Sequence, residues 1–174
     1  DPTVNELESF AADLLDKEAA LYLPTGTQSN LAALLTHCKR GEEYIAGQEA
    51  HTFKYEGGGA AVLGSIQPQP INFERDGSLS IDSIRSVVKP RDNHFARTKL
   101  ICLENTQAGR ALDLDYIRRV RLLCEHNELS LHLDGARFFN ACIAKGLSPE
   151  TLAYNFDSVS ICLSKGLGAP VGSL

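Results

Sequence analysis

Apolar side chains recur along this chain at two different spacings, one helical and one extended. Residues 5–15 place their apolar side chains on one side of a helix, as in an amphipathic surface helix. The same spacing returns in four later segments, residues 28–39, 81–88, 115–125 and 138–144. Gly41 and Pro90 lie where two of these helices end, and Asp113 is a possible N-cap of another.

Short apolar runs lie between these helices and predict strands. Residues 19–23, an apolar run closed by Pro24, predict a buried strand, and residues 44–46 are a second strand candidate. Later strands are predicted at the continuous apolar run 99–103 and at residues 129–133 and 159–163. Residues 60–63 and 66–71 are weak extended candidates. Residues 51–56 predict a short helix or turn, which the glycines at 57–59 interrupt.

Strands that alternate with amphipathic helices are typical of βαβ units. We therefore predict an α/β fold with three layers, α/β/α, around a mainly parallel central sheet. In such sheets ligands bind at the carboxyl ends of the strands. The residues that follow each strand are therefore the first place to look for chemistry.

The composition excludes several classes of function. With 174 residues and 43% hydrophobic content, the chain has enough apolar residues for one domain with a real core. Its net charge of −5 and its scattered Lys and Arg make a nucleic-acid partner unexpected. No apolar run reaches the roughly 18–20 residues that a membrane helix needs, so no membrane partner is expected either.

The cysteines carry no pairing pattern. The chain has five of them, and none forms a CxxC pair. They lie in apolar stretches, which indicates buried thiols in a reducing compartment and hence a cytoplasmic protein. We expect no metal site. Because the chain lacks methionine and has no polar tail after Leu174, we also expect it to be a piece of a longer protein.

Three strand ends carry candidate chemistry. Thr25-Gly26-Thr27 opens a helix, where free N–H groups bind phosphate; a plain turn with a threonine cap is the alternative. Asp134 ends a strand and either pairs with a protonated ring nitrogen or caps the next helix. Lys165 follows the last strand and is either a desolvated, nucleophilic amine or an ordinary solvated lysine.

Together the three groups match the needs of pyridoxal phosphate. Its phosphate needs a helix N-terminus, its pyridine nitrogen needs an acid, and its aldehyde needs a Schiff-base lysine. Their order along the chain also resembles that in the large domain of the aspartate-aminotransferase-like enzymes of fold type I.

Longer motifs resemble one family in particular, the threonine aldolases. The segments that carry the resemblance are Leu23-Pro24-Thr25-Gly26-Thr27-Gln28-Ser29-Asn30, Gly47-Gln48-Glu49-Ala50-His51, Leu103-Glu104-Asn105-Thr106, His132-Leu133-Asp134-Gly135-Ala136-Arg137 and Leu163-Ser164-Lys165-Gly166-Leu167-Gly168. The match runs through the whole chain. It implies that residues 1–174 are a pyridoxal-phosphate-binding large domain, truncated at both ends and without the small C-terminal domain.

The resemblance also implies a role for each site residue. Lys165 forms the Schiff base and Asp134 pairs with the pyridinium nitrogen. Gly26 and Thr27 hold the phosphate, with help from Ser164. His51 stacks on the cofactor ring near the substrate hydroxyl, and His94 is a second histidine near that hydroxyl. Arg137 binds the cofactor or the substrate carboxylate. Glu56, beside the glycine run, is assigned no role.

The activity that the resemblance implies is that of an aldehyde-lyase: retro-aldol cleavage of L-threonine or L-allo-threonine to glycine and an aldehyde, within threonine catabolism and glycine biosynthesis. The base is His51 or a water that it orients. The resemblance further implies a homo-oligomer, a tetramer by analogy, with a small amino acid as substrate. Two alternatives remain at this point: a β-eliminating lyase of an aromatic amino acid, and a non-catalytic protein that keeps the fold.

Overall fold

Five strands form one parallel sheet in the computed structural model, which describes all of residues 1–174. The strands are β1 (Glu42–Gly47), β2 (Gln67–Ile71), β3 (Arg97–Glu104), β4 (Ser130–Gly135) and β5 (Ser158–Ile161). Their order across the sheet is β2-β1-β3-β4-β5, and every neighbouring pair is parallel. The predicted mainly parallel sheet is therefore confirmed.

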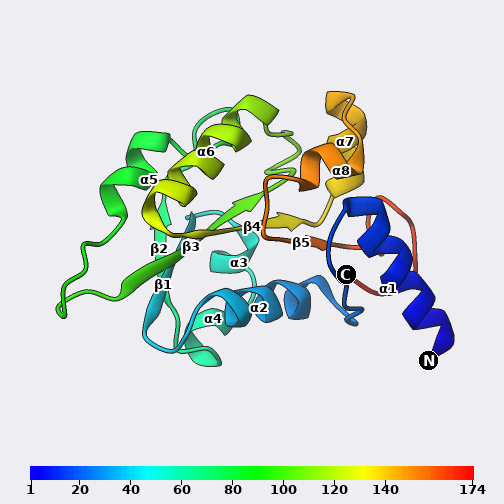
Figure 1. The fold of residues 1–174 in the computed structure, drawn as a ribbon, viewed down its shortest axis with the longest axis horizontal. Helices are drawn as coiled ribbons and strands as arrows, with labels where there is room; N and C mark the ends of the chain where they lie inside the picture. Colours follow the sequence, from blue (N-terminus) through cyan, green and yellow to red (C-terminus); the bar gives the residue numbers. More distant parts are fainter.

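Helices cover both faces of this sheet (Figure 1). They are α1 (Pro2–Leu15), α2 (Gly26–His37), α3 (His51–Lys54), α4 (Gly59–Val62), α5 (Ile81–Val87), α6 (Leu114–Asn127), α7 (Phe138–Lys145) and α8 (Pro149–Ala153). In Figure 1, α2, α3 and α4 lie below the sheet and α5 to α8 lie above it, whereas α1 lies at one end beside α8. This is the expected three-layer arrangement.

The order of the strands creates a switch point. The chain leaves β1, passes through α3 and α4 on one face, and returns as β2 on one side of β1. It then passes through α5 and returns as β3 on the other side of β1. Where the winding direction reverses in this way, a crevice opens outside the carboxyl ends of the strands.

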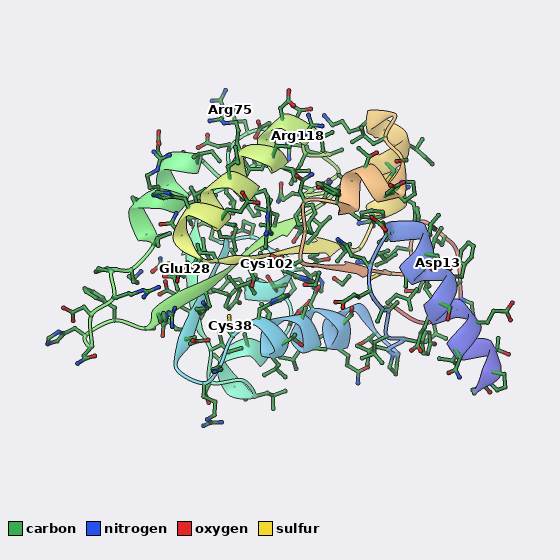
Figure 2. All side chains as sticks on the ribbon, in the orientation of Figure 1. Asp13, Cys38, Arg75, Cys102, Arg118 and Glu128 are labelled. Carbon is green, nitrogen blue, oxygen red and sulfur yellow. The ribbon has the colours of Figure 1, made fainter.

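Side chains alternate between two buried faces along the central strands, because successive residues of a strand point in opposite directions. On the face covered by α5 to α8 lies the larger core, with Ile101 and Leu133 among its members. On the other face a smaller cluster packs under α2 and α4. It includes Cys38 and Cys102, and Figure 2 shows Cys102 between the sheet and α2.

All five cysteines are buried free thiols, as the sequence predicted. Burial in apolar surroundings raises the pKa of the Cys38 thiol to about 12. No helix combines the length and the apolar character that crossing a bilayer would require.

Two of the extended predictions are wrong. Residues 19–23 form no strand, and Leu23 makes only an isolated antiparallel bridge to Ser173. Their apolar side chains instead line a groove beside α1 and α2. Residues 60–63 fall mostly in α4. Gly58, in the left-handed region at φ 67°, starts that turn and accepts the Val62 N–H at 2.9 Å.

Two helix predictions also need correction. The short helix α8 was not predicted; Ser148 caps it and Pro149 occupies its first turn, an ordinary start signal. Asp113 does stand at the N-cap position of α6, but its side chain makes no capping bond there. Its carboxylate pairs with Lys145 of α7 instead.

Candidate functional site

A pocket of about 350 Å³ lies at the carboxyl ends of β4 and β5, beside the first turn of α2. Its lining is Pro24, Thr25, Gly26, Thr27, Asn30, His51, Asp134, Ala136, Cys162, Ser164, Lys165, Pro170, Val171 and Gly172. A larger hollow of about 600 Å³, near Asp76 and Asp115, contains none of the catalytic or cofactor-binding residues predicted from the sequence. The smaller pocket is therefore the candidate site, because the predicted chemistry converges on it.

The first turn of α2 forms one wall of this pocket. Thr25 is the N-cap, and its hydroxyl accepts the Gln28 N–H at 3.2 Å. The threonine cap that was weighed as an alternative is therefore present. It does not use up the anion site, because the N–H groups of the first helical residues, Gly26 and Thr27, have no acceptor within a helix. Together with the helix dipole they attract a negatively charged group.

Asp134 forms the floor of the pocket and is 4% exposed. One carboxylate oxygen, Oδ2, accepts an N–H from Asn30 at 2.8 Å, and the other, Oδ1, accepts the Ala136 N–H at 3.1 Å. The carboxylate thus makes a local turn rather than capping α7, whose N-cap is Arg137. The two N–H donors fix the orientation of the carboxylate at the pocket.

His51 follows β1 and is held at two points. Its backbone N–H donates to Glu104 Oε2 at 2.7 Å, and its ring Nδ1 lies 2.8 Å from Glu56 Oε1. The His51 side chain is 44% exposed toward the pocket, whereas that of Glu56 is 4% exposed. The ring is therefore presented to the pocket with one nitrogen already engaged.

The pKa values of both Glu56 and Glu104 are raised. Burial is the main cause that raises the pKa of Glu56, against hydrogen bonds from Asn30 and His51. Burial likewise raises the pKa of Glu104 to about 7, although the His51 N–H partly opposes this. Both carboxyl groups contact His51, a residue of the pocket lining, and perturbed carboxyl groups are typical of functional sites. Sequence analysis assigned no role to Glu56, Glu104 or Asn30.

Lys165 and Ser164 follow β5 and line the pocket. Both residues are exposed. The structure thus places Lys165 at the predicted site but does not bury it, so the expected desolvation of its amine does not come from residues 1–174 alone. Its side chain nevertheless lines the pocket in which a carbonyl compound could bind.

Two predicted residues lie outside the pocket lining. Arg137 is exposed at the start of α7, near Asp134 in sequence, and makes no ion pair. His94 lies in the exposed loop before the amino end of β3, where its Nδ1 is 2.7 Å from Asp92 Oδ1. Because the pocket is at the carboxyl ends, one copy of the chain does not bring His94 to it. The roles expected for both residues stay predictions.

The chemistry available in the pocket is now clear. Its wall offers N–H groups that suit an anion, its floor presents a carboxylate that suits a cation, and its open side presents a primary amine. Potential ligand atoms of His51, Glu56 and Asp134 lie within 4.8 Å of one another. Hydrogen bonds through Asn30 and between His51 and Glu56 account for that proximity.

Comparison with known proteins agrees with this geometry. A family model described as beta-eliminating lyase matches residues 1–174. The chain is 57% identical over 174 residues to the low specificity L-threonine aldolase of Escherichia coli K12, covering 100% of this chain and 52% of that protein. It is 48% identical over 180 residues to a probable low-specificity L-threonine aldolase 2 of Arabidopsis thaliana, covering 100% and 51%. The chain thus spans about half the length of these relatives.

Solved structures of the same kind superpose well. A putative L-allo-threonine aldolase from Listeria monocytogenes matches with a TM-score of 0.81 and 25% identity, over 99% of this chain and 47% of that chain. Leishmania major threonine aldolase matches with a TM-score of 0.82 and 27% identity, over 93% and 48%. The shared fold includes the strand ends that build the pocket.

Proposed function

Because the chain belongs to the beta-eliminating lyase family, we propose that its protein cleaves L-threonine, L-allo-threonine and similar β-hydroxy-α-amino acids to glycine and an aldehyde, with pyridoxal 5′-phosphate as cofactor. One observation carries the proposal: the first turn of α2, Asp134 and Lys165 line the same pocket, beside His51. Named relatives at up to 58% identity are low-specificity L-threonine aldolases, which supports the substrate class.

The residues present fit this cofactor. Gly26 and Thr27 offer unpaired N–H groups for the phosphate, with the Ser164 hydroxyl close by in the lining. Asp134 offers a nearly buried carboxylate for the pyridine nitrogen, and Lys165 offers the amine for the aldehyde. A side chain at position 26 would have no room, because its Cβ would lie 2.7 Å from Cys162 Sγ.

Each residue then has a defined task. When bound, pyridoxal phosphate supplies an electron sink for the pair released as the Cα–Cβ bond breaks. Asp134 keeps the proton on the ring nitrogen, since its carboxylate is charged and preorganised by two N–H donors. Gly26 and Thr27 hold the phosphate and so set the position of the ring. Lys165 holds the cofactor and gives way to the substrate amine.

His51 is the proposed base for the substrate hydroxyl. Glu56 Oε1 already accepts an N–H from Asn30, so it also acts as the acceptor toward the imidazole. The hydrogen of the neutral ring therefore sits on Nδ1, and Nε2 keeps a lone pair. Nε2, or a water that it orients, takes the hydroxyl proton as the aldehyde forms.

The experiment is a product assay on the full-length protein with L-threonine, L-allo-threonine and phenylserine. We expect glycine and the matching aldehyde from each substrate, and no product from Lys165→Ala. Ammonia and a 2-oxo acid (2-oxobutanoate from threonine, phenylpyruvate from phenylserine) in place of glycine would instead indicate a β-eliminating lyase. A protein that binds no cofactor and forms no product would contradict the proposal.

Assembly, pathway and location complete the proposal. We infer a cytoplasmic homotetramer that degrades threonine and supplies glycine, with no nucleic-acid or membrane partner. The resemblance to threonine aldolases and the buried free thiols support this reading. Sedimentation of the purified full-length protein tests the tetramer, and a monomer would contradict it.

A further inference from the structure

One part of the sheet face under α2 is polar although it is buried. On β4, His132 is 0% and Asp134 is 4% exposed, and on β5 Ser160 is 3% exposed. These residues stand beside one another in register, His132 opposite Ser158 and Asp134 opposite Ser160. The opposite face of β4 carries Leu131 and Leu133. A buried polar layer is costly unless every group in it is hydrogen-bonded, so its partners matter.

Asn30 of α2 lies at the centre of this layer and is 3% exposed. Its Nδ2 donates to Glu56 Oε1 and to Asp134 Oδ2, both at 2.8 Å. Its Oδ1 accepts from Ser160 Oγ at 2.5 Å and lies 3.4 Å from His132 Nε2. A side-chain amide has two N–H donors and two acceptor positions, and here all four are used.

Side chains of β4 and β5 orient this amide from the side of its oxygen atom. Oδ1 can only accept, so His132 Nε2 must carry the hydrogen that faces it. Burial lowers the pKa of His132 to about 3, so the ring is neutral and its Nδ1 accepts from Ser158 Oγ at 2.8 Å. Ser158 Oγ in turn accepts from His37 Nε2 at 2.7 Å. This relay, His37–Ser158–His132, leads from the C-terminal end of α2 to Asn30.

The relay has a consequence for the pocket. If the amide were turned over, its oxygen would face two carboxylate groups, and one of its N–H groups would face the N–H of His132. Those contacts would then be repulsive, and only the Ser160 hydroxyl could adapt, by accepting instead of donating. With the amide held as observed, the two carboxylates share one neutral donor group at a separation at which their charges would otherwise repel each other.

We propose that Asn30 is a positioning residue: its amide bridges the carboxylates of Asp134 and Glu56, and the His37–Ser158–His132 relay with Ser160 determines which way that amide points. In the proposed function, Asp134 faces the cofactor ring and Glu56 holds His51. One amide therefore positions both the carboxylate that pairs with the ring nitrogen and the histidine that acts as the base. This inference rests on the proposed function for those two roles, but the bridge itself is a feature of the fold.

The test uses the full-length protein loaded with pyridoxal phosphate. Asn30→Ala removes the bridge, and Ser160→Ala removes only one contact to the amide oxygen. Asn127→Ala is the matched control, because Asn127 of α6 bonds only to Leu123 O of its own helix. For each variant, kcat and KM with L-threonine are measured separately, together with the absorption spectrum of the bound cofactor as a report on ring protonation.

We expect Asn30→Ala to lower kcat by roughly tenfold or more, the typical value of a hydrogen bond to a charged group, with KM nearly unchanged. The spectrum should shift toward the ring-neutral form. Ser160→Ala should change kcat and the spectrum in the same direction but by less, and Asn127→Ala should leave kcat and the spectrum unchanged. On an Asp134→Asn background, Asn30→Ala should lower kcat by a smaller factor than it does alone, because the part of its effect that acts through Asp134 is already lost.

A wild-type kcat and a wild-type spectrum in Asn30→Ala would overturn the proposal. It would also be overturned if the loss of kcat in the double variant Asn30→Ala/Asp134→Asn equals the product of the losses in the two single variants. If Asn30→Ala does not fold, an unchanged spectrum and kcat in Ser160→Ala overturns it instead. The absorption spectra also allow the Asn30 proposal and the proposed function to fail separately. A wild-type protein that binds the cofactor but releases no glycine would end the proposed function, while the spectra would still decide the role of Asn30.

Discussion

Gly26→Ala adds a single methyl group where the pocket wall is tightest. The new Cβ would lie 2.7 Å from Cys162 Sγ, while the next neighbour, Ser173 Oγ, is at 4.0 Å. Non-bonded heavy atoms of this size prefer separations of about 3.5–4.0 Å, so the contact is roughly 1 Å too short. Cys162 is 8% exposed and lines the pocket, so either its sulfur rotates into the pocket or the first turn of α2 moves.

The expected magnitude follows from the cost of overpacking, about 1–3 kcal/mol for an added methyl group. Movement of the turn displaces the Gly26 and Thr27 N–H groups that face the phosphate. If the whole cost falls on the bound state, the dissociation constant of pyridoxal phosphate rises roughly 5- to 150-fold. Any part of the cost that falls on the cofactor-free fold appears as a lower melting temperature.

The assay is an absorption titration of the full-length protein with pyridoxal phosphate, combined with thermal unfolding without cofactor. Gly26→Ala/Cys162→Ala is the decisive control, because it keeps the new methyl group and removes the sulfur atom that it meets. We expect the double variant to regain most of the affinity. Weak binding that persists in the double variant, or normal binding and melting in Gly26→Ala, would refute the reasoning.

Three further predictions concern the charges around the pocket. Asp134→Asn should keep the cofactor bound but lower turnover on the order of 100-fold, because an amide cannot hold the proton on the ring nitrogen; near-normal kcat would remove that role. His51→Phe should keep cofactor affinity and lose retro-aldol cleavage, as measured by aldehyde release; an unchanged rate leaves His51 only a packing role. The pKa of Glu104 is raised from 4.5 to about 7, so between these pH values the folded protein keeps a proton that the unfolded chain releases. Burial of Glu104 therefore lowers the free energy of unfolding more and more as the pH rises from 4.5 to 7. Glu104→Gln should therefore stabilise the cofactor-free protein near pH 8, by up to ~3 kcal/mol in denaturant unfolding, and the gain should vanish toward pH 4.5; a gain independent of pH contradicts the assignment.

The fold and the main site groups could be predicted because both depend on local patterns. Alternating apolar strands and amphipathic helices required a parallel sheet, and a parallel sheet gathers all its carboxyl ends at one edge. Thr27, Asp134 and Lys165 therefore had to approach one another although they are far apart in sequence. Residues 60–63 were misassigned because a four-residue apolar run carries no reliable period, and only the glycines before it mark a turn of helix.

The second group of site residues could not be predicted in this way. Asn30 meets Asp134 across 104 positions of the chain and Ser160 across 130. Neither contact follows from any spacing, because both depend on how α2 docks on the sheet. One signal was nevertheless present. Ser158 and Ser160 alternate on a strand whose other positions are apolar, and so do His132 and Asp134, which is the pattern of a buried polar face.

The pocket is divided between a rigid floor and an open wall, and the division follows from burial. Asp134 and Asn30 are 4% and 3% exposed and are held by hydrogen bonds within the protein, so their orientations are set before any ligand arrives. Thr27 and Lys165 are exposed and free to exchange partners. Preorganised groups stabilise developing charge without reorganising, whereas exposed groups allow binding and release. The floor therefore determines which chemistry is possible, and the wall determines what can enter.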